Sequence, residues 1–189
     1  MLLEKVRAVE EVFKTLDADI AAFQTRTELH CAWGCGKCCF KSDIEATPLE
    51  FLPFAHHLYT QGTAYEWYEK LRDTNPAHCL ILNPTQGGAG MCSQDHHRGL
   101  ICRLFGYSAR TNKYGNRELV TCQIIKSDQK EGYEAAQAGI EKGEPVPVMN
   151  HYYMQLHAID PTLAQEFFPI NEAIRRAIEV ILHYYAYRE

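Results

Sequence analysis

The chain has 189 residues, of which 46% are hydrophobic and 23% are charged, and its formal net charge is -5. This length and this balance are typical of one globular domain and exclude a disordered or fibrous chain. The negative charge argues against nucleic acid as a partner, because proteins that bind nucleic acid neutralise its phosphates with positive side chains.

Residues 3–28 are predicted to form one long amphipathic helix, because apolar side chains recur at spacings of three and four residues. These side chains are Leu3, Val6, Val9, Phe13, Leu16, Ile20 and Phe23. The first residues lack a signal-peptide pattern, and no apolar run approaches the roughly 20 residues that a membrane-spanning helix needs. We therefore expect a cytoplasmic protein with no membrane partner.

Two shorter helices are predicted next. The stretch TPLE at residues 47–50 combines a capping box with a proline that suits the first helical position, and its helix continues to about Leu58. Another helix follows Gly62 and ends near Arg72.

The middle of the chain is rich in turn formers and contains a predicted β-hairpin. Residues 102–110 and 117–125 flank a turn at residues 112–116. Pairing outward from this turn places Cys102 and Cys122 near the same open end of the ladder. Because neighbouring strands lie close together, we expect the two sulfurs within about 12 Å of each other.

The last third of the chain is predicted to be helical at Glu131–Lys142, Met149–Ile159 and Glu172–Tyr187. The expected fold is therefore mainly α, with a small β-hairpin. We expect a single helical domain over residues 1–189, built around an irregular, cysteine-rich metal-binding centre at residues 31–125.

The string CAWGCGKCCF holds four of the eight cysteines within nine positions: Cys31, Cys35, Cys38 and Cys39. At the C-x2-C spacing of Cys35 and Cys38, a tight turn points two sulfurs at one metal ion or cluster, and Gly36 relieves the steric cost of that turn. Because a reducing cytosol disfavours disulfides, dense cysteine in a cytosolic protein indicates metal binding or catalysis.

The remaining cysteines lie in the irregular centre and at the base of the hairpin: Cys79, Cys92, Cys102 and Cys122. They either complete the first site or form a second one, and the sequence leaves both readings open. Each of them alone also fits a small buried thiol. All eight cysteines are therefore candidate metal ligands.

Other polar residues near these cysteines give a weaker signal. His96 and His97 are candidate ligands or donors to a ligand, although a solvated loop pair is the favoured interpretation. Arg98 and Arg103 flank Cys102, where they either offset the charge of a thiolate or lie at the surface.

For the metal, we favour an iron–sulfur cluster of the 4Fe-4S type over zinc. Successive side chains tend to point apart, so Cys38 and Cys39 are poorly suited to one tetrahedral ion, whereas a cluster offers several irons. The C-x3-C-x2-C spacing is shared with radical S-adenosylmethionine enzymes, which hold a four-iron cluster. Their βα-barrel architecture is not shared, because a helix precedes the string and no βα repeat follows it.

The order of all eight cysteines, with DIEATPLE, CLIL and RGLICRLF between them, resembles the signature of the YkgJ-type cysteine-cluster family, a zinc- or iron-chelating family. The resemblance covers about residues 31–125 and implies metal binding through these cysteines. The flagellin lysine N-methylases resemble the same pattern. This implies an alternative function, the transfer of a methyl group from S-adenosylmethionine to a protein lysine. Catalytic residues stay unknown, and a protein partner or substrate is compatible with the flanking helices.

Overall fold

The computed structural model describes residues 1–32, 35–74, 78–84, 90–93 and 95–187. Helices dominate these residues, which confirms the mainly α fold class, and the strands among them form small two-stranded antiparallel sheets. None of the helices in these ranges combines the length and the hydrophobicity that crossing a lipid bilayer requires.

The chain divides into two compact units, which are described separately. The first unit comprises Met1–Glu11, Gly34–Gly99 and Leu156–Glu189, and the second comprises Val12–Trp33 and Leu100–Gln155. Two helices, α1 (Leu2–Thr27) and α7 (Met149–Ile159), contribute residues to both units. The single-domain organisation over residues 1–189 stays a prediction.

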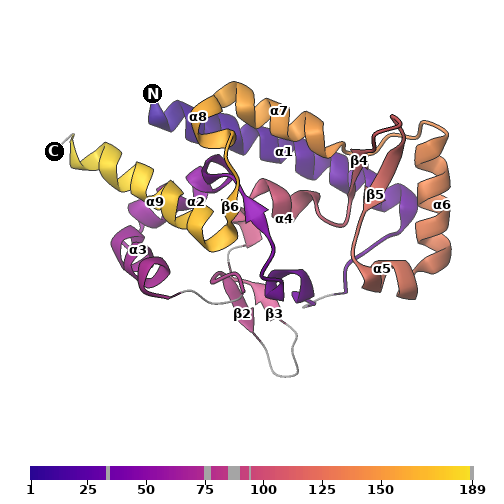
Figure 1. Ribbon diagram of the computed structural model, residues 1–189, viewed down its shortest axis with the longest axis horizontal. Coiled ribbons are helices and arrows are strands. Elements are labelled where there is room, and N and C mark those ends of the chain that lie inside the picture. The colour runs from indigo at the N-terminus through magenta and orange to yellow at the C-terminus, as the bar shows by residue number, and fades with distance from the viewer. Residues whose placement is uncertain (33–34, 75–77, 85–89, 94, 188–189) are drawn as a thin grey trace. The chain divides into compact units, whose positions relative to one another are not determined.

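The first unit is built around the C-terminal helix. Its elements are η1 (Lys37–Phe40), β1 (Glu45–Ala46), η2 (Pro48–Phe51), α2 (Leu52–Thr60), α3 (Ala64–Asp73), β2 (Leu82–Pro84), β3 (Gly90–Cys92), η3 (Asp95–His97), α8 (Pro161–Ala164), β6 (Phe168–Pro169) and α9 (Ile170–Ala186). Helix α9 packs against α2, α3 and η2 (Figure 1). Its apolar face, which includes Ala173, Ile174, Ala177, Ile178 and Ile181, is buried, as a period of 3.6 residues predicts.

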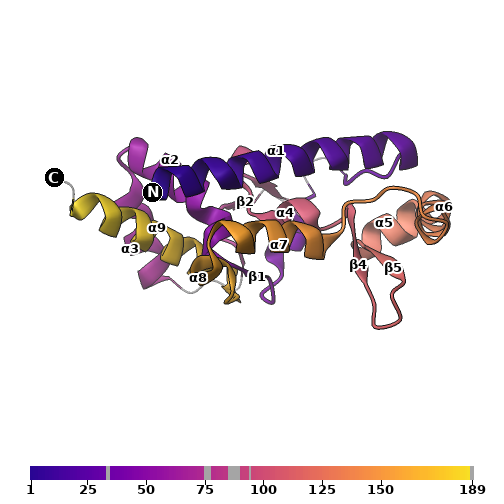
Figure 2. The same ribbon diagram turned by 90° about the horizontal axis from the view of Figure 1, so that it is seen from above.

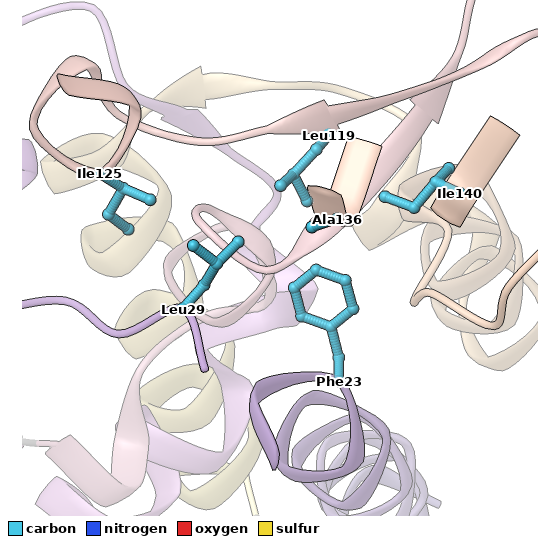
Figure 3. Packing of buried hydrophobic residues seen from close by; sticks show 6 residues of the cluster. All are labelled: Phe23, Leu29, Leu119, Ile125, Ala136 and Ile140. Atoms are coloured by element: carbon cyan, nitrogen blue, oxygen red, sulfur yellow. The ribbon is translucent and has the colours of Figure 1, made fainter. Parts of the chain in front are cut away.

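The second unit places a hairpin against two helices. Its further elements are α4 (Leu100–Leu104), β4 (Ser108–Thr111), β5 (Arg117–Val120), α5 (Gln123–Asp128) and α6 (Lys130–Glu141). Helix α6 contacts both β5 and α5, and Figure 2 shows these helices beside the hairpin. Buried side chains from α1, β5, α5, α6 and the chain after α1 pack into a hydrophobic cluster (Figure 3). Its members are Phe23, Leu29, Leu119, Ile125, Ala136 and Ile140.

The predicted helices are found where the sequence places them. Helix α7 covers the predicted residues, and α1, α3, α6 and α9 begin and end within two residues of the expected positions. The helix predicted from residue 47 starts instead as the 3-10 turn η2 and becomes α-helical at Leu52. Several short elements were not predicted: α4, α5, α8 and the strand pairs β1–β6 and β2–β3.

The predicted hairpin turn at residues 112–116 is confirmed. Ser108 pairs with Val120 at the open end of the ladder, and the N–H of Asn112 donates to the carbonyl of Asn116 at 2.8 Å. The strand expected from Cys102 onward is wrong at its start, because Leu100–Leu104 forms α4 and the ladder begins only at Ser108.

The capping box at the start of η2 is present and buried. The backbone N–H and the hydroxyl of Thr47 both donate to Glu50 Oε1, at 2.9 and 3.2 Å. Both side chains are fully buried. Because a buried carboxylate is costly unless it is hydrogen-bonded, Thr47 stabilises both the helix start and the Glu50 side chain.

We predict that Thr47→Ala lowers the free energy of unfolding by about 1 to 2 kcal/mol, because the helix loses its cap and Glu50 loses a buried donor. The exposed Thr162→Ala at the start of α8 is the matched control and should change stability by less than about 0.5 kcal/mol. Urea unfolding followed by circular dichroism measures both. Equal effects of the two substitutions would contradict this role of Thr47.

Candidate metal centre

The eight cysteines lie in the two units in unequal numbers. Five belong to the first unit, Cys35, Cys38, Cys39, Cys79 and Cys92, and three to the second, Cys31, Cys102 and Cys122. All eight lie in the described part of the chain, and none is joined to another by a disulfide. Residues 33 and 34, between Cys31 and Cys35, lie outside the described residues.

The string of the first unit forms the predicted tight turn. Gly36 adopts a left-handed conformation with φ of 51°, which glycine reaches without steric cost. The N–H of Cys39 donates to the carbonyl of Gly36 at 2.9 Å, and the N–H of Lys41 donates to the carbonyl of Cys38 at 3.2 Å. The 3-10 turn η1 therefore fixes the backbone of both adjacent cysteines.

This turn brings the thiols of Cys38 and Cys39 together. A hydrogen bond from the Cys39 side chain is the main cause that lowers the pKa of Cys38 to about 6, although partial burial opposes it. The positive charge of Arg98 acts in the same direction. Our expectation that the two side chains point apart is therefore wrong, because the 3-10 backbone does not alternate successive side chains as an extended chain does.

Cys79 lies beside the same turn. Its N–H donates to the carbonyl of Cys39 at 3.1 Å, and its side chain is buried. Burial raises the pKa of Cys79 to about 11, and the charges of Cys92 and Cys38 contribute to the rise. Cys92 enters from β3, where it pairs with Leu82 of β2. The first unit thus gathers Cys38, Cys39, Cys79 and Cys92.

The segment that carries Cys79 is held by helix α9. The side chain of Asn171 accepts the N–H of Leu80 at 2.9 Å and donates to the carbonyl of His78 at 2.9 Å. The ring of His78 also packs against Phe40 of η1, with ring centroids 6.0 Å apart. No sequence signal marked Asn171, because its partners lie more than 90 positions away.

In the second unit, Cys31 and Cys122 lie near Tyr107. The N–H of Cys31 donates to the Tyr107 hydroxyl at 2.7 Å. Burial is the main cause that raises the pKa of Tyr107, and the charges of Cys31 and Cys122 add to it. Cys122 caps α5, where its sulfur accepts the N–H of Ile125 at 3.5 Å. Cys102 lies on α4, and its predicted closeness to Cys122 stays a prediction.

The chain before Cys31 is held by Gln129. Its amide accepts the N–H of His30 at 3.0 Å and donates to the carbonyl of the same residue at 2.6 Å. The backbone that enters the cysteine string is therefore fixed one residue before the first thiol.

The weaker candidates near the cysteines have other contacts. Arg103 is buried, pairs with Asp17 and lies over the ring of Phe13 at 4.8 Å, so the surface role, one of its two predicted alternatives, is wrong. His97 is half-buried and stacks on His57 with ring centroids 4.2 Å apart, so it is not part of a solvated loop pair.

The thiol chemistry fits a soft metal, because thiolate sulfur is a preferred ligand of zinc and of iron–sulfur clusters. Among the described residues, however, no three cysteine, histidine, aspartate or glutamate side chains are arranged to hold a single metal ion as they stand. The fit therefore rests on the kind and number of donors and on their contacts.

A mainly helical chain with eight cysteines, none of them in a disulfide, has the donor set of a cysteine-rich metal-binding protein. The chain belongs to the CxxCxxCC family, described as "Putative zinc- or iron-chelating domain", which it matches over residues 30–134. This match confirms the family resemblance found in the sequence and supports metal binding. No curated protein and no solved structure matches the chain.

We predict that Cys38 reacts faster than Cys79 with an alkylating reagent at neutral pH in the metal-free, reduced protein. Its pKa of about 6 makes it a thiolate above that pH, whereas the pKa of about 11 keeps Cys79 protonated. The rate of Cys38 alkylation should fall as the pH decreases through about 6, and Cys39→Ala should move this midpoint to higher pH.

Alkylation with iodoacetamide over a range of pH, followed by mass mapping of the peptides, measures both rates. Cys79 is the internal control. A Cys38 that reacts no faster than Cys79 at pH 7 would contradict the geometry of η1.

Proposed function

We propose that this protein is a cytoplasmic metal-binding protein that holds an iron–sulfur cluster of the 4Fe-4S type through clustered cysteine thiolates. The observation that carries the proposal is the contact of Cys38 with Cys39, next to the buried Cys79. Cys92 and Cys35 are the further ligand candidates of the same unit. Cys31, Cys102 and Cys122, which belong to the second unit, stay ligand candidates from the sequence.

Closely spaced thiols of this kind need a cation to share their charge. The pKa of Cys79 rises partly because of the charges of Cys38 and Cys92, so these sulfurs would repel one another if all were ionised. A bound metal offsets this repulsion and deprotonates its thiol ligands outright. Metal binding is therefore coupled to folding of the cysteine-rich region.

The number of thiols does not separate a 4Fe-4S cluster from zinc, because each takes four cysteine ligands. Five cysteines belong to the first unit alone, which is enough for either metal. We favour the cluster because its irons accept thiols at separate corners, whereas zinc needs four thiols at tetrahedral angles around one ion. Zinc stays the alternative, because the side chains of Cys38 and Cys39 do not point apart.

The enzymatic alternative, methyl transfer from S-adenosylmethionine to a protein lysine, stays a hypothesis from the sequence resemblance alone. A visible spectrum that responds to S-adenosylmethionine would favour it.

We predict that Cys38→Ser and Cys35→Ser each abolish stoichiometric metal, since a hydroxyl is a poor ligand for a soft metal. Lys37→Ala, an exposed residue between the two cysteines, is the matched control and should keep the metal. Elemental analysis and the visible spectrum of anaerobically purified protein measure the outcome. If both serine variants keep full metal content, the site does not lie in this string.

Removal of the metal should also destabilise the protein. A chelator is expected to lower Tm, because a ligand that binds only the folded state stabilises it. The metal-depleted Cys38→Ser variant is the control and should not respond to the chelator. An unchanged Tm of the wild type after complete metal removal would contradict the coupling of metal and fold.

A further inference from the structure

Asn171 connects helix α9 to the segment that carries Cys79. It lies outside the cysteine-rich segment and beyond residues 30–134 of the family match. Its side chain forms two hydrogen bonds of 2.9 Å, one to Leu80 and one to His78. These bonds grip the backbone on both sides of Cys79. A side-chain amide suits this task, because it offers an acceptor and a donor in one rigid plane.

The position of Asn171 is itself fixed. Strand β6, directly before α9, pairs with β1 through Glu45 with Pro169 and Ala46 with Phe168. The N–H of Ile170 adds a hydrogen bond of 2.9 Å to the carbonyl of Ile44. The first turn of α9 is thus tied to the chain that leaves the cysteine string, five residues after η1.

These contacts form a closed circuit within the first unit. The chain leaves η1 and forms β1, which pairs with β6. Asn171 follows β6 and forms hydrogen bonds with the backbone of His78 and Leu80. Between them, the N–H of Cys79 donates to the carbonyl of Cys39, directly after Cys38 in η1. The chain and these backbone and amide hydrogen bonds together restrain the backbone of Cys79 relative to that of Cys39.

We propose that Asn171 is a positioning residue for the metal site, which holds the backbone around Cys79 so that its sulfur meets the thiols of η1. The inference rests on the proposed function in that Cys79 is taken as a metal ligand. Asn171 touches neither metal nor thiol in this role, and it acts through the backbone of His78 and Leu80.

The test compares the wild type with Asn171→Ala, Asn171→Asp and the exposed control Asn150→Ala on α7. Hydrogen exchange of the Leu80 amide measures whether its hydrogen bond to Asn171 is intact. The rate of metal loss to a chelator measures how firmly the site holds its metal. Alkylation of Cys79 relative to Cys38, read by mass mapping, shows whether the effect is local. All measurements use the full chain as purified under anaerobic conditions.

Asn171→Ala should speed exchange of the Leu80 amide by about tenfold, and should speed metal loss and Cys79 alkylation by roughly two- to tenfold each. Asn171→Asp keeps the acceptor for Leu80 but loses the donor to His78. It should therefore retain the amide protection and still lose metal faster than the wild type. Asn150→Ala should match the wild type, and the reactivity of Cys38 should not rise in step with that of Cys79.

The inference would be overturned by a Leu80 amide that exchanges without protection in the wild type, or by an Asn171→Ala variant with wild-type metal loss and Cys79 alkylation. A general rise in the reactivity of all cysteines would also overturn it, since that marks global destabilisation. A wild type without thiolate-bound metal would refute the proposed function instead. The role of Asn171 in holding the backbone around Cys79 would then be judged from Leu80 exchange and Cys79 alkylation alone.

Discussion

Hydrogen bonding and burial decide which of the neighbouring thiols of the first unit is ionised. Cys38 can ionise near pH 6 because the Cys39 thiol donates to it and Arg98 lies near. Cys79 stays a neutral thiol at neutral pH, because burial, with smaller contributions from the charges of Cys92 and Cys38, raises its pKa to about 11. In the proposed metal site, Cys38 would supply a thiolate at neutral pH, and a bound metal would deprotonate the buried Cys79. This combination is what the proposed chelating role requires.

The backbone around these thiols is irregular, so regular secondary structure does not hold it. The hydrogen bonds that fix it come from a few side chains and very short strands. Asn171 forms hydrogen bonds with the backbone on both sides of Cys79 in the first unit. Gln129 forms hydrogen bonds with the backbone of His30, directly before Cys31, in the second. Each amide satisfies both a backbone N–H and a backbone carbonyl, and those that Asn171 satisfies are partly buried, where leaving them unpaired is costly. These amide hydrogen bonds restrain the backbone next to Cys79 and before Cys31.

Sequence reasoning succeeded where the signal is local. The period of apolar side chains gave α7 and α9, the Thr47 and Glu50 pair marked the helix start, and the turn at residues 112–116 marked the hairpin. It failed where the partners are distant or the element is short. The pairing of β1 with β6 joins residues more than 120 positions apart, and α4 has five residues, too few to show a period. The contact between Cys38 and Cys39 depends on the 3-10 turn, which the C-x2-C spacing alone did not specify.

The central claim is that clustered thiolates hold the metal. X-ray absorption spectroscopy at the iron and zinc edges of anaerobically purified protein tests it most directly, because it reports the element and its ligand atoms together. We expect iron with a shell of sulfur neighbours and further iron neighbours beyond it. Zinc with four sulfur neighbours would contradict the cluster but keep the thiolate site. A shell of nitrogen and oxygen, or the absence of bound metal, would contradict the account as a whole.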